Sequence, residues 1–334
     1  MPRNVIDCAR SISIALPPGY QQRDVLAFHA RDKEGCAEQM IPGSILTPAL
    51  KPALQRNSRV ESQPDPAPAS EAGPTRIRKG MLLRGVAVVV DIALHDQHAI
   101  CTLQADGALP AGAIEKARAA LPGMLGLRIA PEPFLALASS DTLLGPLVRN
   151  QPGLRIVQAA SIFEAVSWAI IGQQINLSFA IALRRTLIQQ AGRPHSSGLC
   201  CYPEACDVAR LNLDALTSRK FSRAKADTLL RIARLTESGQ LDLSLAPDQI
   251  APALLAIKGI GPWSVNYTLL RGYGAADCSL HGDGAVRLAL QRLKGAAEKP
   301  AIACAQAMLE RYRPHRSMAA AHLWASLHPA ARSE

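Results

Sequence analysis

The chain has 334 residues, and its 37 lysines and arginines outnumber its 27 aspartates and glutamates, giving a formal net charge of +10 at pH 7. This surplus favours polyanionic partners, either nucleic acid or an anionic membrane surface. No apolar run approaches the roughly 20 residues that span a bilayer, and the N-terminal residues lack the hydrophobic core of a secretory signal. We therefore expect a soluble intracellular protein, cytoplasmic or nucleoid-associated, with no membrane partner.

Short strands are predicted in the first third of the chain. Residues 11–16 alternate between polar and apolar side chains, residues 85–94 are rich in β-branched side chains, and residues 99–103 follow a polar turn. Between them, residues 43–75 are proline-rich and polar, and such a segment cannot bury enough apolar surface to offset its ordering entropy. We expect a small antiparallel sheet that a disordered insertion interrupts.

From residue 112 onward the pattern becomes helical. Apolar residues recur at helical spacing, and capping signals mark several starts. The predicted helices cover residues 113–121, 161–171, 177–190, 223–238, 249–257, 262–271, 284–293, 301–312 and 317–327. Two helical lobes around a cleft would fit this order.

The cysteines, eight in all, are scattered along the chain. Because nothing indicates secretion, we interpret them as reduced thiols rather than as a disulfide framework. Cys200, Cys201 and Cys206 cluster downstream of His195, which raises the hypothesis of a zinc site. The paired C-x-x-C spacing typical of such sites is missing, so we assign no metal there.

Gly259, Ile260 and Gly261 separate two predicted helices in a pattern typical of a tight hairpin. The glycines allow positive φ, and Pro262 suits the first position of the next helix because its φ is already set. Free N–H groups at that helix start point outward beside the positive end of the dipole, which suits a phosphate oxygen. Ile260 is expected to face inward. Taken alone, the pattern is equally consistent with a simple turn.

Asp283 lies between Gly282 and Gly284, at the predicted start of a helix, where an N-cap belongs. A purely structural role is the plain interpretation, because Asp commonly accepts backbone N–H bonds at helix starts and does nothing more. The same N–H groups and the helix dipole also favour an ionised carboxylate. The structural and chemical roles are therefore compatible.

Several ordered motifs now form one pattern: residues 259–267, 270–272, Asp277, Asp283, 312–317 and Trp324. Together they resemble the helix-hairpin-helix DNA glycosylase superfamily and, within it, the DNA-3-methyladenine glycosylase II family, over roughly residues 150–327. The resemblance implies an α+β N-terminal domain, residues 1–110, followed by a mainly α-helical, two-lobed helix-hairpin-helix glycosylase core, residues 111–330.

The resemblance assigns the catalytic role to Asp283. As the base departs, the sugar gains oxocarbenium character, and a fixed negative charge beside C1′ stabilises it more in the transition state than in the ground state. Trp263 stands where bifunctional relatives have a lysine that attacks C1′ as a Schiff-base nucleophile. An indole cannot do this, so we expect a monofunctional enzyme that uses water and leaves an abasic site. Gly282 replaces a second acidic residue that is common in the family.

Trp263, Tyr267 and Trp324 match family positions that line the flipped-base site. Their π faces would attract an alkylated base that carries positive charge. The alternative is that Trp263 and Tyr267, four residues apart on one helix, simply pack in the core.

The resemblance also implies residues that open and grip the duplex. Gln174 falls at the position that fills the space left by the flipped nucleotide, with Gln173 as support for the loop. A satisfied turn glutamine is the alternative. Contacts to the DNA backbone would come from the hairpin residues Gly259, Ile260 and Gly261. Apart from the resemblance, the basic residues Arg223, Lys225 and Arg316 are further candidates for phosphate contact, and the alternative is that they are solvated surface residues.

No cofactor is expected to be required. Only Cys304 lies beyond the catalytic region, so we expect no iron–sulfur cluster of the kind that many endonuclease III relatives carry. Whether the hairpin carbonyls bind a structural or DNA-bridging metal ion stays open. The expected partner is double-stranded DNA containing damaged bases, bound by a monomer.

Three functions are weighed. The first is a monofunctional DNA glycosylase that excises alkylated bases, such as 3-methyladenine, in base excision repair. The second is a bifunctional endonuclease III-like glycosylase-lyase, which Trp263 and the missing cluster cysteines oppose. The third is a non-catalytic helix-hairpin-helix DNA-binding protein that uses the hairpin alone.

Overall fold

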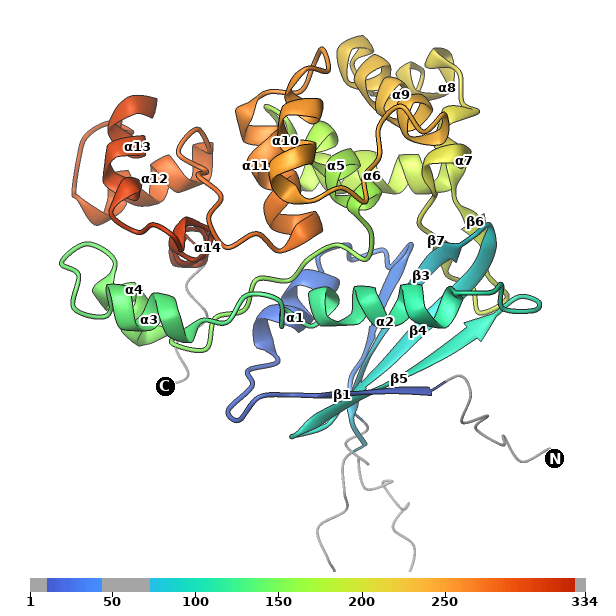
Figure 1. Cartoon of the computed structure of the whole chain (residues 1–334), viewed down its shortest axis with the longest axis horizontal. Helices are drawn as coiled ribbons and strands as arrows, with labels where there is room; N and C mark the ends of the chain where they lie inside the picture. The colour runs from blue at the N-terminus through green and yellow to red at the C-terminus, as the bar shows by residue number, and fades with distance from the viewer. Residues whose placement is uncertain (1–10, 44–72, 328–334) are drawn as a thin grey trace, which may run out of the picture.

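The computed structural model describes residues 11–43 and 73–327, so most of the insertion predicted at residues 43–75 lies outside the described residues. One part of the molecule is an antiparallel sheet in the spatial order β1-β5-β4-β3-β2 (Figure 1). Its strands are β1 (Ser11–Ala15), β2 (Glu38–Ile41), β3 (Thr75–Leu83), β4 (Val86–Leu94) and β5 (His98–Ala105). The strands predicted from the sequence correspond to β1, β4 and β5 and are confirmed.

β3 and β4 are joined by the two-residue turn Arg84–Gly85. Both turn residues have positive φ, 50° and 78°, and this geometry matches the twist of paired strands. One face of the sheet packs on α1 (Arg23–His29) and α2 (Ala113–Met124). The shared core includes Ile12, Val25, Ile77, Val90, Ala117 and Leu121. α2 therefore packs with the sheet, although the predicted boundary at residue 110 assigned it to the helical core.

Helices make up most of the remaining chain, and each predicted helical segment contains an observed helix. The longer ones are α5 (Ile162–Gly172), α6 (Leu177–Ala191), α9 (Arg223–Glu237), α10 (Pro247–Leu255), α12 (Gly284–Leu293), α13 (Ile302–Glu310) and α14 (Arg316–Ser326). Shorter helices that the sequence did not reveal are α3 (Glu132–Ala138), α4 (Gly145–Asn150), α7 (Ala205–Ala209) and α8 (Leu213–Thr217). The helix predicted at residues 262–271 divides into α11 (Pro262–Thr268) and a π-helical turn (Leu269–Tyr273).

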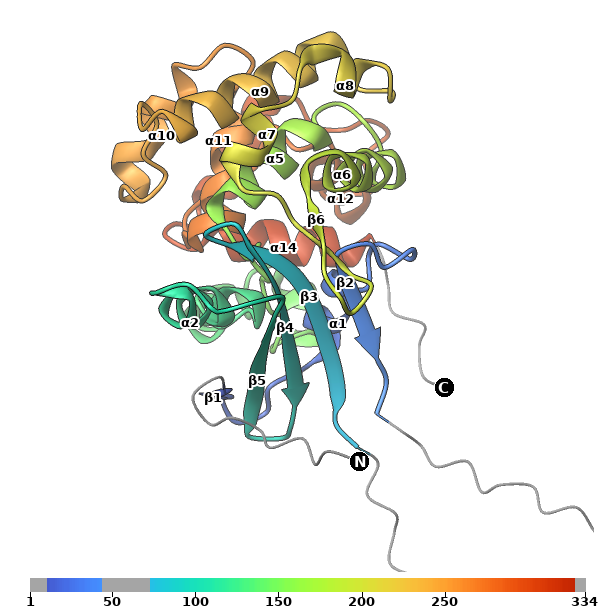
Figure 2. The same cartoon turned by 90° about the vertical axis from the view of Figure 1, so that its right-hand side faces the viewer.

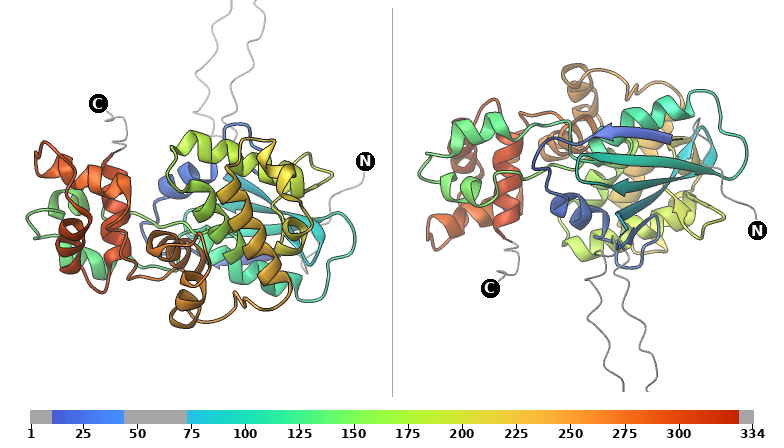
Figure 3. Two further views of the ribbon diagram at one scale, coloured as in Figure 1. Left: turned by 90° about the horizontal axis from the view of Figure 1, so that it is seen from above. Right: turned by 90° about the horizontal axis from the view of Figure 1, so that it is seen from below.

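The helices form two lobes with separate cores. α5, α6 and α7 to α11 surround one core, whereas α3, α4 and α12 to α14 surround the other. Figure 3 shows the second lobe set to one side of the sheet and the first lobe, and Figure 2 shows the first lobe above the sheet. Tyr267 on α11 contacts both cores. The predicted two-lobed helical arrangement is therefore present.

α3 and α4 precede α5 in the chain but pack beside the C-terminal helices. Phe134 on α3 lies 6.0 Å from the ring of Tyr312, and the Tyr312 hydroxyl donates a 2.8 Å hydrogen bond to Asp141. Figure 1 shows this crossing of the chain at one end of the molecule. Within residues 11–43 and 73–327, no helix has the length and apolar composition needed to cross a bilayer.

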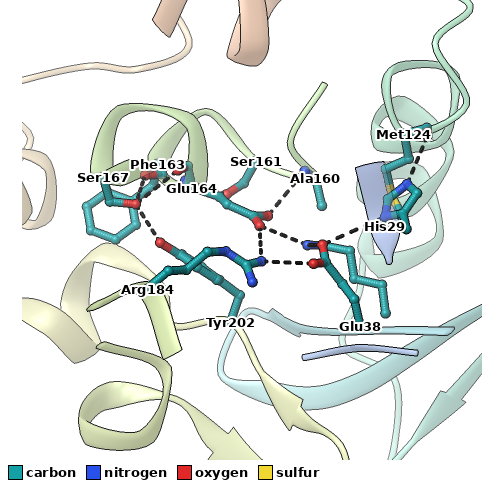
Figure 4. A network of polar contacts seen from close by, with 11 residues as sticks. His29, Glu38, Met124, Ala160, Ser161, Phe163, Glu164, Ser167, Arg184 and Tyr202 are labelled. Atoms are coloured by element: carbon teal, nitrogen blue, oxygen red, sulfur yellow. Dashed lines mark hydrogen bonds and ion pairs between the residues drawn. The ribbon is translucent and has the colours of Figure 1, made fainter. Parts of the chain in front are cut away.

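A buried ion network of Glu38, Lys79, Glu164 and Arg184 joins the sheet to α5 and α6. Figure 4 shows Glu38, Glu164 and Arg184 turned toward one another. Lys79 Nζ lies 2.7 Å from Glu38 Oε1 and 2.8 Å from Glu164 Oε1, and Arg184 Nη2 lies 2.7 Å from Glu164 Oε1. Burial opposes ionisation of both carboxyls, but the two cations outweigh this effect. They hold the pKa of Glu164 below its usual range and the pKa of Glu38 well below it.

Candidate active site and nucleic-acid interface

The hairpin between α10 and α11 has the predicted geometry. Gly259 has a φ of +96°, and Ile260 turns inward with only 7% of its surface exposed. Gly261 is the N-cap of α11 and Pro262 takes the first position. The first amides of α11 have no acceptor within the helix, so they are free to bind a phosphate oxygen.

The two hairpin glycines are predicted to respond differently to substitution. At Gly259 an added Cβ would lie 2.1 Å from Thr228 Oγ1 on α9, and the positive φ disfavours any L side chain. At Gly261 an added Cβ would have no heavy atom within 4 Å. We expect Gly259→Ala to lower the free energy of unfolding by about 1–3 kcal/mol in urea titrations, and Gly261→Ala to leave it nearly unchanged.

DNA binding by the Gly261→Ala variant then tests the phosphate contact. If a phosphate approaches the start of α11, the added methyl group weakens binding although the fold is intact. Equal loss of stability in the two variants would contradict the different environments of the two glycines.

Asp283 is the N-cap of α12, and four donors surround its carboxylate. Oδ1 accepts the backbone N–H groups of Ala285 and Val286, both at 2.9 Å. The indole N–H of Trp263 donates to Oδ2 at 2.9 Å, and that of Trp324 donates to Oδ1 at 3.1 Å. Three elements, α11, α12 and α14, therefore hold one half-buried carboxylate in place.

A cleft of about 1160 Å³ opens at this carboxylate. Its lining comes from the loop after α5 (residues 173–176, predicted to be the wedge and called the wedge loop below), the hairpin, the start of α12 and the end of α14. It includes Gln174, Gly261, Trp263, Tyr267, Asp283 and Trp324. The Trp263 and Tyr267 rings lie 5.1 Å apart, and the Tyr267 and Trp324 rings lie 6.2 Å apart. The three predicted pocket aromatics thus lie together with the predicted catalytic carboxylate.

Sequence reasoning missed two residues of this cleft, Trp168 and Arg271. The Trp168 indole donates a 2.8 Å hydrogen bond to the Tyr267 hydroxyl and fixes that ring. Both residues line the cleft. Trp168 lies on the helix that ends at the wedge loop, and Arg271 belongs to the 270–272 motif, so their positions in the sequence were the available signals.

The wedge loop follows α5. Gln173 Nε2 donates to the Gly259 carbonyl at 2.9 Å and to Ser264 Oγ at 2.8 Å, so it ties this loop to the hairpin, a link that the sequence did not predict. Gln174 is exposed and has a φ of +55°, a conformation that costs a non-glycine residue about 1 kcal/mol or more. Leu177 nearby is 57% exposed. The loop and the first residue of α6 therefore present one amide and one apolar side chain beside the cleft.

The predicted phosphate contacts have different outcomes. Arg223 is exposed in the first turn of α9, where its contact stays a prediction. Lys225 instead donates to the carbonyls of Ile170, Ile171 and Gln173 at the end of α5. Arg316 differs from the exposed phosphate-binding cation that we expected, because only 8% of its surface is exposed.

Asp277 explains the position of Arg316. The Arg316 Nε and Nη2 atoms donate to the two Asp277 oxygens at 2.7 and 2.9 Å, and Glu310 accepts from Nη1 at 3.2 Å. A guanidinium paired in this way binds the start of α14 to the loop before α12. These bonds help to hold the C-terminal lobe together.

The zinc hypothesis is not supported by the positions of its residues. The ring of His195 is bonded to Ser197 Oγ and the Gln104 carbonyl, each at 2.9 Å. Among the described residues, Glu204, Cys206 and Asp207 form the one cluster with metal-ligand proximity. Glu204 already accepts from Gly85 and Lys116. Metal binding by the hairpin carbonyls, which the sequence left open, is not tested here, and the Gly259 carbonyl already accepts a hydrogen bond from Gln173.

Comparison of the sequence with known proteins identifies the family of this chain. No family model matches the sequence. YfjP of Bacillus subtilis, named as a candidate DNA-3-methyladenine glycosylase, is 31% identical over 192 residues, which cover 56% of this chain and 67% of YfjP. The chain belongs to the DNA-3-methyladenine glycosylase family.

Other members of the DNA-3-methyladenine glycosylase family match over shorter shares. DNA-3-methyladenine glycosylase of Bacillus subtilis is 34% identical over 146 residues, 42% of this chain and 48% of the relative. DNA-3-methyladenine glycosylase 2 of Escherichia coli is 30% identical over 185 residues, 54% of this chain and 63% of the relative. The matched part of the chain therefore spans 48% of the length of the first of these relatives and 63% of the second.

Solved structures agree on the fold of this glycosylase family. A 3-methyladenine DNA glycosylase from Archaeoglobus fulgidus superposes with a TM-score of 0.71 at 19% identity, covering 94% of this chain and 97% of the other. A Schizosaccharomyces pombe 3-methyladenine DNA glycosylase in complex with abasic DNA gives a TM-score of 0.51 at 23% identity, covering 58% and 96%. The first alignment includes the sheet as well as the helical lobes, since it covers nearly all of both chains.

Proposed function

We propose that this chain is a monofunctional DNA glycosylase that flips an alkylated base, such as 3-methyladenine, out of double-stranded DNA and hydrolyses its N-glycosidic bond. The observation that carries the proposal is the Asp283 carboxylate, held by two indole N–H groups and two backbone N–H groups at the edge of an aromatic cleft. Family membership supports the same reaction class. The product is an abasic site, which enters base excision repair.

The carboxylate acts on the sugar rather than on the base. Cleavage of the C1′–N bond leaves positive charge on the sugar, and a fixed anion stabilises that charge without reorganising during the reaction. The four donors keep Asp283 in one orientation, so this arrangement exists before substrate binds. Water then adds to C1′, and the same carboxylate orients it.

Base flipping would use the wedge loop and the hairpin together. Extrusion of a nucleotide costs a few kcal/mol, and less for a damaged pair. Gln174 is proposed to enter the vacated space and bind the orphaned partner base, while the start of α11 binds the backbone. Because Gln173 bonds both the Gly259 carbonyl and Ser264 Oγ, the wedge and the phosphate site would move as one unit.

Hydrolysis without lyase chemistry is supported by the cleft lining. No lysine is among the described residues that line the cleft, and Trp263 uses its indole N–H on Asp283. A Schiff base requires an amine at C1′. We therefore expect borohydride to trap no covalent protein–DNA adduct during base release. Efficient trapping would favour the alternative, an endonuclease III-like glycosylase-lyase.

A further inference from the structure

Lys225, in the first turn of α9, is bonded to the end of α5. Its Nζ donates to the carbonyls of Ile170 at 3.3 Å, of Ile171 at 3.0 Å and of Gln173. A protonated lysine has three N–H donors and no acceptor, so each donor has a carbonyl partner here. The last carbonyls of a helix have no partner within it and lie at the negative end of its dipole. Lys225 therefore supplies a cation to the end of α5, which has no basic residue in its own last turn.

The third of these carbonyls belongs to the wedge loop. A peptide group is planar, so the bond from Lys225 to the Gln173 carbonyl also fixes the direction in which the chain enters Gln174. Gln174 has a φ of +55°, and a strained conformation of this kind persists only where its surroundings determine it. The side chain of Gln173 is held as well, by the Gly259 carbonyl and Ser264 Oγ. Both ends of Gln173 are thus anchored directly before the residue proposed to enter the duplex.

The start of α9 also supports the hairpin. Thr228, one turn after Lys225, is buried, and a Cβ added at Gly259 would lie 2.1 Å from its Oγ1. Thr228 Oγ1 donates to the Ala224 carbonyl at 2.8 Å, which holds this side chain against its own helix. α9 therefore contacts the wedge loop through Lys225 and the hairpin through Thr228. Because Gln173 joins the wedge loop to the hairpin, the three elements form a closed set of contacts.

Resting on the proposed function, we propose that Lys225 is a positioning residue for base flipping, which holds the wedge loop in one conformation before DNA binds. Ordering a flexible backbone segment costs conformational entropy. A loop that is already ordered does not meet this cost when Gln174 enters the duplex, so extrusion of the nucleotide becomes easier. Lys225 acts through the wedge loop, since its N–H donors are bonded within the protein.

Single-turnover release of 3-methyladenine from two duplexes tests this role. In the first duplex the lesion pairs with thymine, and in the second it faces an abasic-site analogue. Extrusion costs less for a base without a partner, so a defect in the wedge loop slows the first reaction more than the second. Lys225→Met keeps the apolar stem and removes the ammonium. We expect it to lower the ratio of the paired rate to the unpaired rate by about 5- to 30-fold, the factor for ordering one backbone residue.

Arg234→Met is the matched control. Arg234 also lies on α9, and its guanidinium donates to the carbonyls of Ala209 and Leu211 at 3.5 and 3.3 Å. It follows Lys225 by nine residues, about 13.5 Å along the helix. The control loses the same charge and similar bonds, and we expect it to keep the wild-type ratio. Lys225→Gln keeps an amide donor and is expected to lower the ratio by less than Lys225→Met.

A combined variant tests whether Lys225 acts through the wedge. Gln174→Ala removes the side chain that Lys225 is proposed to position. If this route is correct, adding Lys225→Met to Gln174→Ala lowers the ratio by less than about 2-fold further, which is the limit within which independent effects usually add. Two losses that multiply in full would contradict the route.

The ratio separates positioning from general damage. Damage that reaches the cleft lowers both rates together, and single-turnover rate constants at saturating enzyme do not depend on the amount of folded protein. An unchanged ratio in Lys225→Met and Lys225→Gln would overturn the role of Lys225, and so would an equal loss in Arg234→Met. Both of these results leave the proposed function standing. Release of 3-methyladenine from neither duplex by the wild-type protein overturns the proposed function and this role with it.

Discussion

Replacement of Asp283 by Asn is expected to lower the rate of base release by about 10²–10³-fold, the scale of losing one preorganised electrostatic contact at a developing charge. The amide keeps the size of the side chain but removes the anion that stabilises the oxocarbenium-like sugar. It also keeps the cap of α12, because an Asn oxygen accepts the same N–H groups that Oδ1 accepts from Ala285 and Val286. Single-turnover assays with an alkylated duplex measure the effect.

Asp227→Asn is the matched control for this variant. It changes the net charge by the same amount, but Asp227 lies on the exposed surface of α9, where it pairs with Arg231. We expect wild-type base release from the control, and wild-type DNA binding from both variants. Full activity of Asp283→Asn would contradict the catalytic assignment. Loss of binding together with activity would instead favour a role for Asp283 in DNA contact.

Glu164→Gln is expected to lower the free energy of unfolding by about 3–5 kcal/mol, because it removes one of the two carboxylates that face the buried Lys79 and Arg184 and leaves Glu38 alone against two cations. Glu164 binds both Lys79 and Arg184 in a region that solvent does not reach. Urea denaturation monitored by circular dichroism measures the change. Glu34→Gln is the matched control, since Glu34 is 67% exposed and pairs with Arg185. We expect the control to cost less than about 1 kcal/mol.

Lowering the pH should also destabilise the buried ion network of Glu38, Lys79, Glu164 and Arg184. The pKa of Glu164 lies below its usual value of 4.5 in the folded protein, and that of Glu38 lies well below it. The stability that these carboxylates contribute is therefore fully present above pH 4.5 and is lost as pH falls through the lower folded pKa values. In Glu164→Gln one of these groups no longer titrates, so stability should fall less steeply with acid. An equally steep fall in both proteins would contradict this account.

Local sequence patterns predicted the longer helices and the strands β1, β4 and β5 because each of these has a clear period, composition or cap. β3 was missed because Lys79 interrupts its apolar face, and only partners distant in the sequence, Glu38 and Glu164, allow that lysine to be buried. α7 and α8 have five residues each, too few for a helical period to appear. The π-helical turn has no sequence signal that we recognise.

Among the residues of the site, too, positions set by local sequence were predicted, whereas contacts with distant segments were not. The cap position of Asp283 is local and was predicted, but its bonds to Trp263 and Trp324 depend on how α14 docks against α11 and α12. Arg316 resembled a surface cation because Asp277, its partner, belongs to another segment of the chain. Lys225 was misinterpreted for the same reason, since its acceptors lie at the end of α5.

Hydrolysis of a base–sugar bond at Asp283 is tested most directly with one DNA duplex that carries a single defined alkylated purine. Released base and strand breaks are followed over time, with and without alkali. We expect free base to appear and strand breaks to form only after alkali treatment, since an abasic site is the product. No base release, or strand breaks that form without alkali, would contradict the account.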